Sequence, residues 1–423
     1  MTAHQNTEAR ESLPAFPSPR ADKCPFDPPP AFEEHRENAG ITEIRLWNNQ
    51  TAWLITRADY FRALLNDPRV SADRSRPGMP MTSKSSTAKL PTRASFRMMD
   101  GEEHRRLRRM VTRDFSMPSV EASREQIQQI CGELIDEMIA KGPTAELIRD
   151  YAFGLPTQLI CHILGISTDQ RDFLETQVAT MFNRDTDADI AEAAGRALVD
   201  YLRTLIEEVG GQEPRDNVVS RLVHRQYRQD KIDLPDLLNT LVQLIAGGFD
   251  TTGNGIGSSV HLLLQHPDRL AALRDSDDPR FIAGAIEELL RYIPIIDSGF
   301  DRVAGADIDL DGHLIKAGQG LIFNVPAANR DPRDFDAPGE LDLCRDARAH
   351  VAFGYGPHQC LGQNLARVEM QVAVPALLRR LPGLAHAVPV DRIEWRFDRQ
   401  IIGLDALPVT WDQEAALALQ RSR

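Results

Sequence analysis

Apolar residues recur at helical spacing through most of the chain as far as Arg291, and Gly-Pro or Asp-Pro pairs end successive segments. Two stretches depart from this pattern. Residues from Ile41 to Thr56 alternate around Asn48-Asn49-Gln50, which predicts a hairpin, and a second strand-rich stretch runs from about Arg302 to Phe323. The pattern therefore predicts a mainly α protein with a small β region.

The chain of 423 residues exceeds the usual length of one domain, yet it contains no linker-like break. Prolines crowd the stretch from Leu13 to Pro30, which indicates irregular structure near the beginning of the chain. We therefore expect an irregular N-terminal segment over residues 1–40 and a single domain over residues 41–423. Hydrophobic residues make up 42% and charged residues 26%, which is ordinary for a globular enzyme.

Charge and composition exclude several classes of function. A net charge of −13 argues against nucleic acid as a partner. The first twenty residues are polar and charged, and no stretch approaches the ~20 apolar residues that a membrane helix needs, so neither a signal peptide nor a membrane anchor is expected. The five cysteines are odd in number and lack C-x-x-C spacing. This pattern favours a reducing, cytoplasmic setting over a disulfide framework or a zinc site.

Cys360 stands in a loop that contains three glycines, Phe353-Gly354-Tyr355-Gly356-Pro357-His358-Gln359-Cys360-Leu361-Gly362. Glycine adopts backbone conformations closed to other residues, so amide N–H groups can approach the sulfur. Helical periodicity begins after Gly362, and the dipole of a helix N-terminus favours an anionic thiolate. Such a loop is typical of a thiolate that holds a haem iron. The alternative is a buried structural cysteine.

Glycines are also concentrated in a predicted helix from Leu234 to Gln265, around Ala246-Gly247-Gly248-Phe249-Asp250-Thr251. Each glycine inside a helix costs about 1 kcal/mol relative to alanine, which suggests that a flat group approaches the backbone here. The Thr251 hydroxyl can compete for the carbonyl of Gly247, four residues earlier, and open the helix beside an acid and an alcohol. The alternative is that these glycines pack against another helix while Asp250 forms a salt bridge.

The cysteine loop matches, position for position, the haem-binding signature F-x-x-G-x-x-x-C-x-G, so the chain resembles the cytochrome P-450 family. Two further motifs precede this loop in the order found in the family: the segment Gly247 to Thr251 and the E-x-x-R run Glu288-Leu289-Leu290-Arg291. The resemblance extends from Ile41 to Pro408. It implies the cytochrome P-450 fold, haem b as cofactor and Cys360 as the axial ligand of the haem iron.

The resemblance also implies roles for further residues. Asp250 and Thr251 correspond to the pair that delivers protons to iron-bound oxygen. The residues that would bind the cofactor or its two propionates are His104, Arg108, Gly247, Arg302, Phe353, His358, Cys360 and Gly362. Glu288, Arg291 and Arg345 would form a structural ion-pair network. One departure lies at Asp100-Gly101-Glu102, where many relatives have prolines, and it leaves the start of the helix that carries His104 open.

The implied activity is insertion of one oxygen atom from O2 into a small organic substrate, in secondary metabolism. The chain contains no flavin or iron–sulfur segment, so electrons would come from a separate ferredoxin and its NAD(P)H-dependent reductase. The exposed cluster Arg105, Arg106 and Arg109 is a candidate docking site for that ferredoxin, or simply a solvated face. The alternatives are a haem-thiolate enzyme of altered chemistry (nitration, oxidative coupling, or a reaction with peroxide or nitric oxide) and a non-enzymatic haem sensor.

The resemblance further implies which segments line the substrate pocket. They are the loop Arg76 to Phe96, the region Met181 to Ile190, the helix near Ala246, the segment Ile295 to Phe300 and the turn Ile401-Ile402. Polar residues at Asp297 and Ser298, together with Asp185, Asp187 and Asp189, suggest a polar or cationic substrate. The alternative is that these aspartates solvate a loop.

Overall fold

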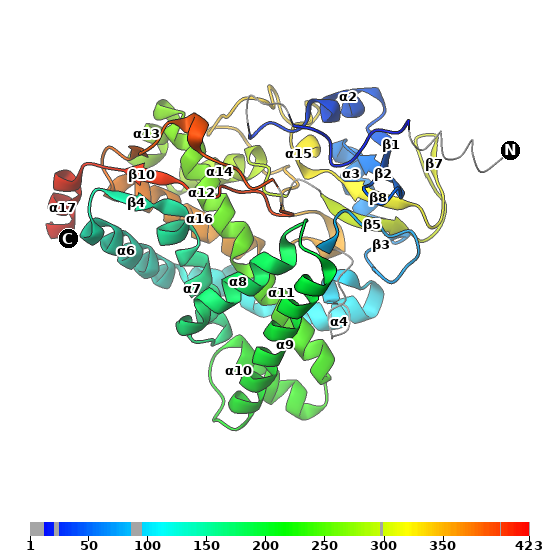
Figure 1. The fold of residues 1–423 in the computed structure, drawn as a ribbon, viewed down its shortest axis with the longest axis horizontal. Helices are drawn as coiled ribbons and strands as arrows, with labels where there is room; N and C mark the ends of the chain where they lie inside the picture. The colour runs from blue at the N-terminus through cyan, green and yellow to red at the C-terminus, as the bar shows by residue number, and fades with distance from the viewer. Residues whose placement is uncertain (1–11, 21–24, 86–94, 297–298, 398, 423) are drawn as a thin grey trace.

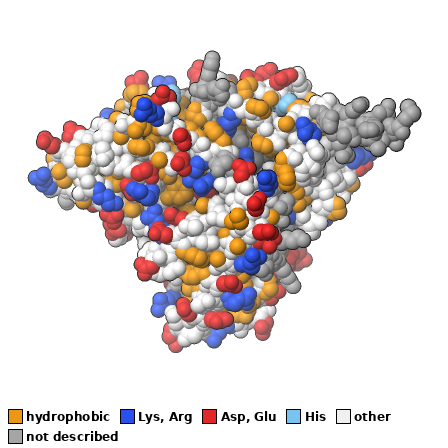
Figure 2. Space-filling model, viewed as in Figure 1, with side chains coloured by type: hydrophobic (Ala, Val, Ile, Leu, Met, Phe, Trp, Pro, Cys, Tyr) orange, Lys and Arg blue, Asp and Glu red, His pale blue; other side chains and the backbone are white. Residues whose placement is uncertain are grey.

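The computed structural model describes residues 12–20, 25–85, 95–296, 299–397 and 399–422. A small β region lies at one side, near the N-terminus, and a large helical body fills the rest, with the C-terminal helix α17 (Gln413–Arg421) at the far side (Figure 1). The prediction of a mainly α protein with a small β region is therefore confirmed. On the face that Figure 2 shows, acidic and basic side chains of the described residues are interspersed.

The main sheet has five strands in the order β1-β2-β8-β5-β3. Their bounds are β1 (Ile41–Arg45), β2 (Thr51–Ile55), β8 (Gly320–Phe323), β5 (Phe300–Ala304) and β3 (Val70–Ser71). β1 and β2 form the predicted hairpin, with Ile41 opposite Ile55, and Asn49 takes the positive φ of 63° that the turn requires. β2 joins β8 in parallel, so the two predicted strand-rich stretches meet in one sheet.

Alternate residues of this sheet belong to different hydrophobic clusters because side chains point to opposite faces along a strand. Ile55 and Phe323 pack on one face with α3 (Ala58–Asn66). Leu54 and Ile322 pack on the other face with Phe16 and Phe32. Both faces of the central strands are therefore covered, one of them by residues that precede β1.

The expectation of an irregular segment over residues 1–40 is wrong for residues 30–38. Residues 30–38 form the helix α2 (Pro30–Asn38), in which Pro30 occupies the first turn, where a missing N–H costs nothing. Phe32 and Arg36 of α2 are buried, and the ring of Phe32 stacks on Phe16 at 6.4 Å between centroids. The sheet face thus stabilises this helix, which the proline-rich composition before it gave no reason to expect.

The helical body is built around α16 (Gln363–Arg380), which packs against α6, α12, α13 and α14. The other helices of the body are α4 (Gly101–Thr112), α5 (Met117–Ala122), α6 (Arg124–Lys141), α7 (Gly154–Leu164), α8 (Arg171–Phe182), α9 (Ala188–Gly210), α10 (Val218–Arg225), α11 (Leu234–Gly248), α12 (Asp250–Leu264), α13 (Pro267–Asp275) and α14 (Pro279–Tyr292). The remaining elements are α15 (Val325–Ala328), the hairpin β6 (Ile308–Leu310) and β7 (His313–Ile315), and the sheet of β4 (Thr144–Glu146), β10 (Pro408–Thr410) and β9 (Ala385–His386). No helix of the described residues is long and apolar enough to cross a membrane.

The helix predicted from Leu234 to Gln265 is two helices, α11 and α12, which meet at Phe249. Asp233 caps the first of them by accepting a hydrogen bond from the N–H of Asp236, as the sequence indicated. Phe249 leaves helical geometry with φ of −126°, and α11 ends there. This interruption falls between Gly247 and Thr251.

Candidate functional site

A cavity of about 320 Å³ lies where the α11–α12 junction, β5 and the loop before α16 meet. Cys360 and Gly247 both line it. Much of its remaining wall is apolar and includes Phe96, Phe182, Leu244, Ile296, Phe300 and Ile401. All five segments expected to line a substrate pocket are thus represented, by Phe96, Phe182, Ala246, Ile296 with Phe300, and Ile401 in turn.

The cysteine loop folds back on itself, because the N–H of Cys360 donates to the carbonyl of Phe353 at 2.8 Å. Gly354 and Gly356 have φ values of 71° and 72°, and a Cβ on Gly356 would lie 2.6 Å from the carbonyl oxygen of Leu65. Glycine is therefore required at both positions. At Gly362 the same expectation is wrong: its φ is −83°, which any residue adopts.

Gly362 contributes through its backbone N–H instead. The N–H groups of Gly362 and Gln363, at the start of α16, both donate to the sulfur of Cys360. Burial raises the pKa of the Cys360 thiol, while these N–H groups and Arg108 act in the opposite direction. A bound metal ion would complete the shift, because a coordinating thiol loses its proton.

The α11–α12 junction places an alcohol at the cavity and an acid behind it. Thr251 and Gly247 line the cavity, and the Thr251 hydroxyl donates to the carbonyl of Gly247 at 3.3 Å. Asp250 is 5% exposed and is not among the lining residues. Burial raises the pKa of Asp250, which the nearby Arg396 opposes.

The two adjacent glycines serve different purposes. A Cβ on Gly248 would lie 2.6 Å from a side-chain carbon of Ile160 on α7, so Gly248 is needed for helix packing. A Cβ on Gly247 would meet only Gln243 Nε2, at 3.6 Å. Both glycines line the cavity, but the packing alternative describes Gly248, whereas Gly247 has space beside it.

Asn254 and Arg396 hold Asp250, and the sequence reasoning missed both. Asn254 Nδ2 donates to Asp250 Oδ1 at 3.2 Å, and Arg396 Nη2 donates to Asn254 Oδ1 at 3.0 Å. The spacing of four residues between Asp250 and Asn254 on one helix was a usable signal. Arg396 is distant in sequence, so no local pattern pointed to it.

Arg108 from α4, Arg302 from β5 and His358 from the cysteine loop line the cavity, and the buried His104 from α4 packs against His358. The rings of His104 and His358 stack with centroids 4.1 Å apart. Burial, followed by the nearby His358 and Arg108, lowers the pKa of His104 to about 4. Arg108 Nη2 donates to the carbonyl of Gln359 at 2.6 Å, which ties α4 to the loop.

The sequence left open how α4 begins, and in the structure the helix begins at Gly101, directly after Asp100. Gly101 begins the helix with a φ of 66°, and Asp100 does not cap it. The Asp100 carboxylate instead accepts hydrogen bonds from the hydroxyl of Ser71 and from the N–H of Ala72 at 3.0 Å, and its Oδ1 lies 3.5 Å from His358 Nε2. Asp100 therefore orients the histidine that stacks on His104.

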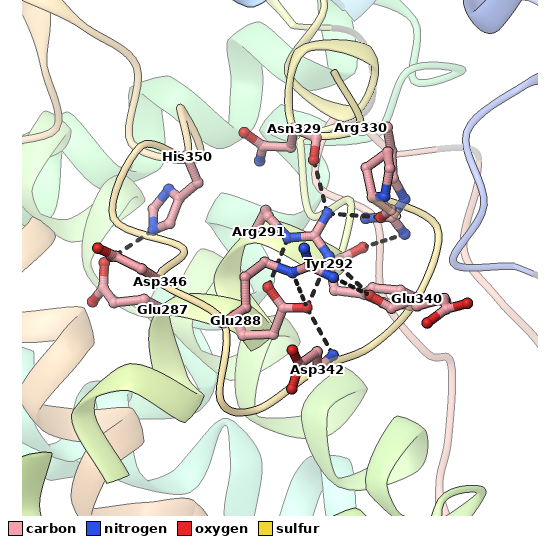
Figure 3. Close-up of polar contacts among 12 residues, drawn as sticks. Glu287, Glu288, Arg291, Tyr292, Asn329, Arg330, Glu340, Asp342, Asp346 and His350 are labelled. Carbon is pink, nitrogen blue, oxygen red and sulfur yellow. Dashed lines mark hydrogen bonds and ion pairs between the residues drawn. The ribbon is translucent and has the colours of Figure 1, made fainter. Parts of the chain in front are cut away.

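Glu288, Arg291 and Arg345 form a buried network beneath α14, as Figure 3 shows for its central residues. Arg291 uses all five of its N–H donors. The acceptors are Glu288 Oε2 (2.7 Å) and Oε1 (2.8 Å) and the carbonyls of Asn329 (2.9 Å), Pro338 (2.8 Å) and Glu340 (3.2 Å). Arg345 Nε donates to Glu288 Oε1 at 3.3 Å. The network ties α14 to the segment that precedes the cysteine loop.

A second network, which the sequence reasoning missed, reaches the loop itself. Arg367 on α16 donates to Glu287 through Nε at 2.7 Å and Nη2 at 3.0 Å, and the ring of His350 lies 3.1 Å from the same carboxylate. Burial acts to raise the pKa of Glu287, but hydrogen bonds from His350 and Arg367 outweigh burial and hold this pKa at about 2. The guanidinium of Arg367 lies 4.5 Å from the centroid of Phe353, so this network supports the ring at the start of the cysteine loop.

The cavity suits an apolar cofactor that carries two carboxylates and a metal ion that the Cys360 thiolate would hold. The buried atoms His104 Nε2 and His358 Nδ1 have no hydrogen-bond partner among the described residues. No Asp or Glu of the described residues lines the cavity, whereas Arg97, Arg108 and Arg302 do. Two propionates would supply the missing acceptors and negative charge. Fold and cavity together define a haem-thiolate protein.

Comparison with known proteins gives the same result. A family model for cytochrome P450 matches residues 167–382. Cytochrome P450-SU2 of Streptomyces griseolus is 39% identical over 97% of this chain and 100% of its own length. For pentalenic acid synthase of Streptomyces avermitilis the identity is 39%, over 94% and 97%. The crystal structure of mycinamicin VIII C21 methyl hydroxylase from Micromonospora griseorubida has a TM-score of 0.87 and 37% identity, over 94% of this chain and 100% of that chain.

The chain belongs to the cytochrome P450 family. It is therefore an oxidoreductase that incorporates molecular oxygen and holds haem b through a cysteine thiolate. The predicted fold, class of enzyme and cofactor are confirmed.

Several expectations about the substrate pocket have a different outcome. Asp297 and Ser298, and residues 86–94 of the expected lid, lie outside the described residues. Asp185, Asp187 and Asp189 are not among the lining residues of the cavity. Arg97, one residue beyond the segment Arg76 to Phe96, is a lining residue that the sequence reasoning missed.

Proposed function

We propose that this P450 inserts one oxygen atom from O2 into a small, mostly apolar organic substrate of secondary metabolism, with Cys360 as the axial ligand. The observation that carries the proposal is that one cavity is lined both by Cys360, whose sulfur faces the N–H groups of Gly362 and Gln363, and by Gly247 and Thr251. The relatives that act in secondary metabolism support the substrate class, since one of them is a hydroxylase whose structure contains mycinamicin VIII.

The residues that would hold haem divide into two groups. His104, Arg108, Arg302 and His358 would pair with its two propionates, because they bring cationic and hydrogen-bonding groups to one part of the cavity. Gly247 would admit the macrocycle close to α11, and Phe353 and Gly362 would shape the side that carries the sulfur. When bound, the haem supplies the oxygen activation that no amino-acid side chain can perform.

The chain's own contribution to catalysis is to hold and move protons. Thr251 presents its hydroxyl at the cavity, and its 3.3 Å bond to Gly247 is long enough to exchange for another partner. Asp250 lies behind it, and because burial raises its pKa, this carboxyl retains a proton to higher pH than an exposed one. An acid in this position can resupply the hydroxyl.

Electrons would come from a separate ferredoxin and its NAD(P)H-dependent reductase. Arg105 and Arg109 are exposed on α4, the helix whose inner face carries His104 and Arg108. Arg106, the third expected member of the docking cluster, is engaged with Glu103 at 2.6 Å and Asp236 at 3.1 Å. The docking proposal therefore rests on Arg105 and Arg109.

The ferrous carbon monoxide spectrum of the haem-loaded protein tests the axial ligand. Wild type should give the band of a thiolate-ligated haem, and Cys360→Ser should lose that band because a hydroxyl is a poor donor to iron. Cys344→Ser, at an exposed cysteine outside the cavity, is the matched control and should keep it. Retention of the thiolate band in Cys360→Ser would refute the assignment. Product formation with a surrogate ferredoxin and reductase would then distinguish an enzyme from a haem sensor.

A further inference from the structure

Arg97 projects into the cavity from the short turn Phe96–Met98. Its Nε donates to Gln243 Oε1 at 3.3 Å, and the hydroxyl of Ser95 donates to the same oxygen at 3.0 Å. Ser95 also accepts a hydrogen bond from the N–H of Arg97. The turn, the guanidinium and the side chain from α11 therefore hold one another in place.

The guanidinium of Arg97 has no carboxylate partner among the described residues. The nearby Asp301 is paired with Arg74 at 3.2 Å. Burial, followed by repulsion from Arg74 and Arg302, lowers the pKa of Arg97 to about 10. Asp301 attracts Arg97 but is already paired with Arg74, and Arg97 is accessible from the cavity that it lines, so its guanidinium is available to an anion that arrives with a ligand.

Gln243 places the Arg97 guanidinium close to Gly247 and Thr251. It lies on α11 one turn before Gly247, and its Nε2 would be 3.6 Å from a Cβ on that glycine. Arg97 and Gln243 thus line the same cavity as Thr251. His104, Arg108, Arg302 and His358 already offer cationic or donor groups for two propionates, so Arg97 exceeds what the cofactor requires.

We infer that Arg97, oriented by Gln243, binds a carboxylate of the substrate, so that the enzyme prefers an apolar molecule with one anionic end. This inference rests on the proposed function and specifies its substrate class. The walls beyond Arg97 are apolar, with Phe182, Leu244 and Ile401 among them, and would enclose the uncharged body. The charge inferred for the substrate is therefore negative, whereas Asp185, Asp187 and Asp189 suggested a cationic substrate. Those aspartates do not line the cavity.

Optical titration of the ferric, haem-loaded enzyme tests the inference with straight-chain fatty acids from octanoate to hexadecanoate and their methyl esters. At neutral pH wild type should bind at least one acid about tenfold more tightly than its ester, because a charge-assisted hydrogen bond is roughly twice as strong as a neutral one. Arg97→Gln should abolish this ratio, Gln243→Leu should reduce it several-fold, and the exposed control Arg203→Gln should preserve it.

The rate of haem transfer to apomyoglobin shows whether Arg97 binds a carboxylate of the substrate or a propionate of the haem. Unchanged haem transfer in Arg97→Gln, together with loss of the acid preference, supports the inference. Faster haem loss with an unchanged preference would instead make Arg97 a propionate ligand and overturn it. A wild-type enzyme that binds no acid more tightly than its ester would overturn it as well. The carbon monoxide spectrum of wild type tests the thiolate-ligated haem of the proposed function, and its outcome does not depend on Arg97.

Discussion

Two groups of charged side chains lie within one molecule and are satisfied in different ways. Beneath α14, Arg291 directs all five donors to protein acceptors, and Glu288 is fully buried between it and Arg345. In the cavity wall, Arg97 forms no ion pair with a carboxylate of the described residues, and His358 Nδ1 likewise has no hydrogen-bond partner among them.

This difference separates structure from function on physical grounds. A buried charge costs several kcal/mol unless its partners replace water. Where the protein supplies every partner, as around Arg291, the charges connect segments of the chain. Where it leaves cationic and donor groups facing a cavity, as at His358 and Arg97, the partners must come from a ligand.

The largest expected effect comes from opening the closed network. Arg291→Ala removes one partner of a fully buried pair and leaves Glu288 uncompensated, which should lower the free energy of unfolding by about 3–5 kcal/mol. Equilibrium urea unfolding followed by circular dichroism measures this loss. Arg348→Ala is the matched control, since its pair with Asp346 is 80% and 65% exposed and is screened by solvent, so its loss should leave the free energy of unfolding nearly unchanged.

The same measurement on Arg97→Gln completes the comparison. Because Arg97 has no carboxylate partner to leave behind, its removal should change the free energy of unfolding by less than about 1 kcal/mol. Equal losses for Arg291→Ala and Arg97→Gln would show that the two regions do not differ in the way proposed.

Asp250 provides a test of intermediate size, since it is buried like the network but is only partly paired. Asp250→Asn keeps the shape and removes the acid, so product formation should fall on the order of 10²-fold while substrate binding is retained. Steady-state turnover and optical titration measure the two quantities. Because a proton donor acts only while protonated, the wild-type rate should also decrease as pH rises through the raised pKa of Asp250, a limb that the variant lacks.

The exposed Asp200→Asn on α9 is the control for this change and should leave turnover intact. If Asp250→Asn retained wild-type turnover, the proton would have to come from another group. In that case Asp250 would belong with the closed network, as a residue that fastens α12 to Arg396 through Asn254.

The features that the sequence predicted are those encoded within a few residues. The hairpin turn at Asn49, the cap at Asp233 and the bond from Thr251 to Gly247 each join residues at most four apart. The family resemblance supplied the longer connections, such as Arg345 to Glu288. Together they anticipated most of the site residues that the structure brings to the cavity.

The features that the sequence did not predict depend on tertiary neighbours. Arg396 reaches Asn254 across 142 positions, and Arg367 reaches Glu287 across 80. The fold of α2 depends on a sheet face that forms only when β2 and β8 pair.

The smallest expected effect lies on the outer face of α4, where charges meet solvent rather than a cavity. Reversing Arg105 and Arg109 to Glu should slow reduction by an acidic ferredoxin about tenfold at low ionic strength, because steering by exposed charges acts on association. Stopped-flow reduction at increasing salt measures the rate, and the difference should shrink as the charges are screened. Arg106→Gln is the matched control, because its pairs with Glu103 and Asp236 leave it little charge to offer a partner. If the double reversal kept the wild-type rate and salt dependence, the outer face of α4 would be only a solvated surface, and the functional charges of this helix would be confined to its inner face.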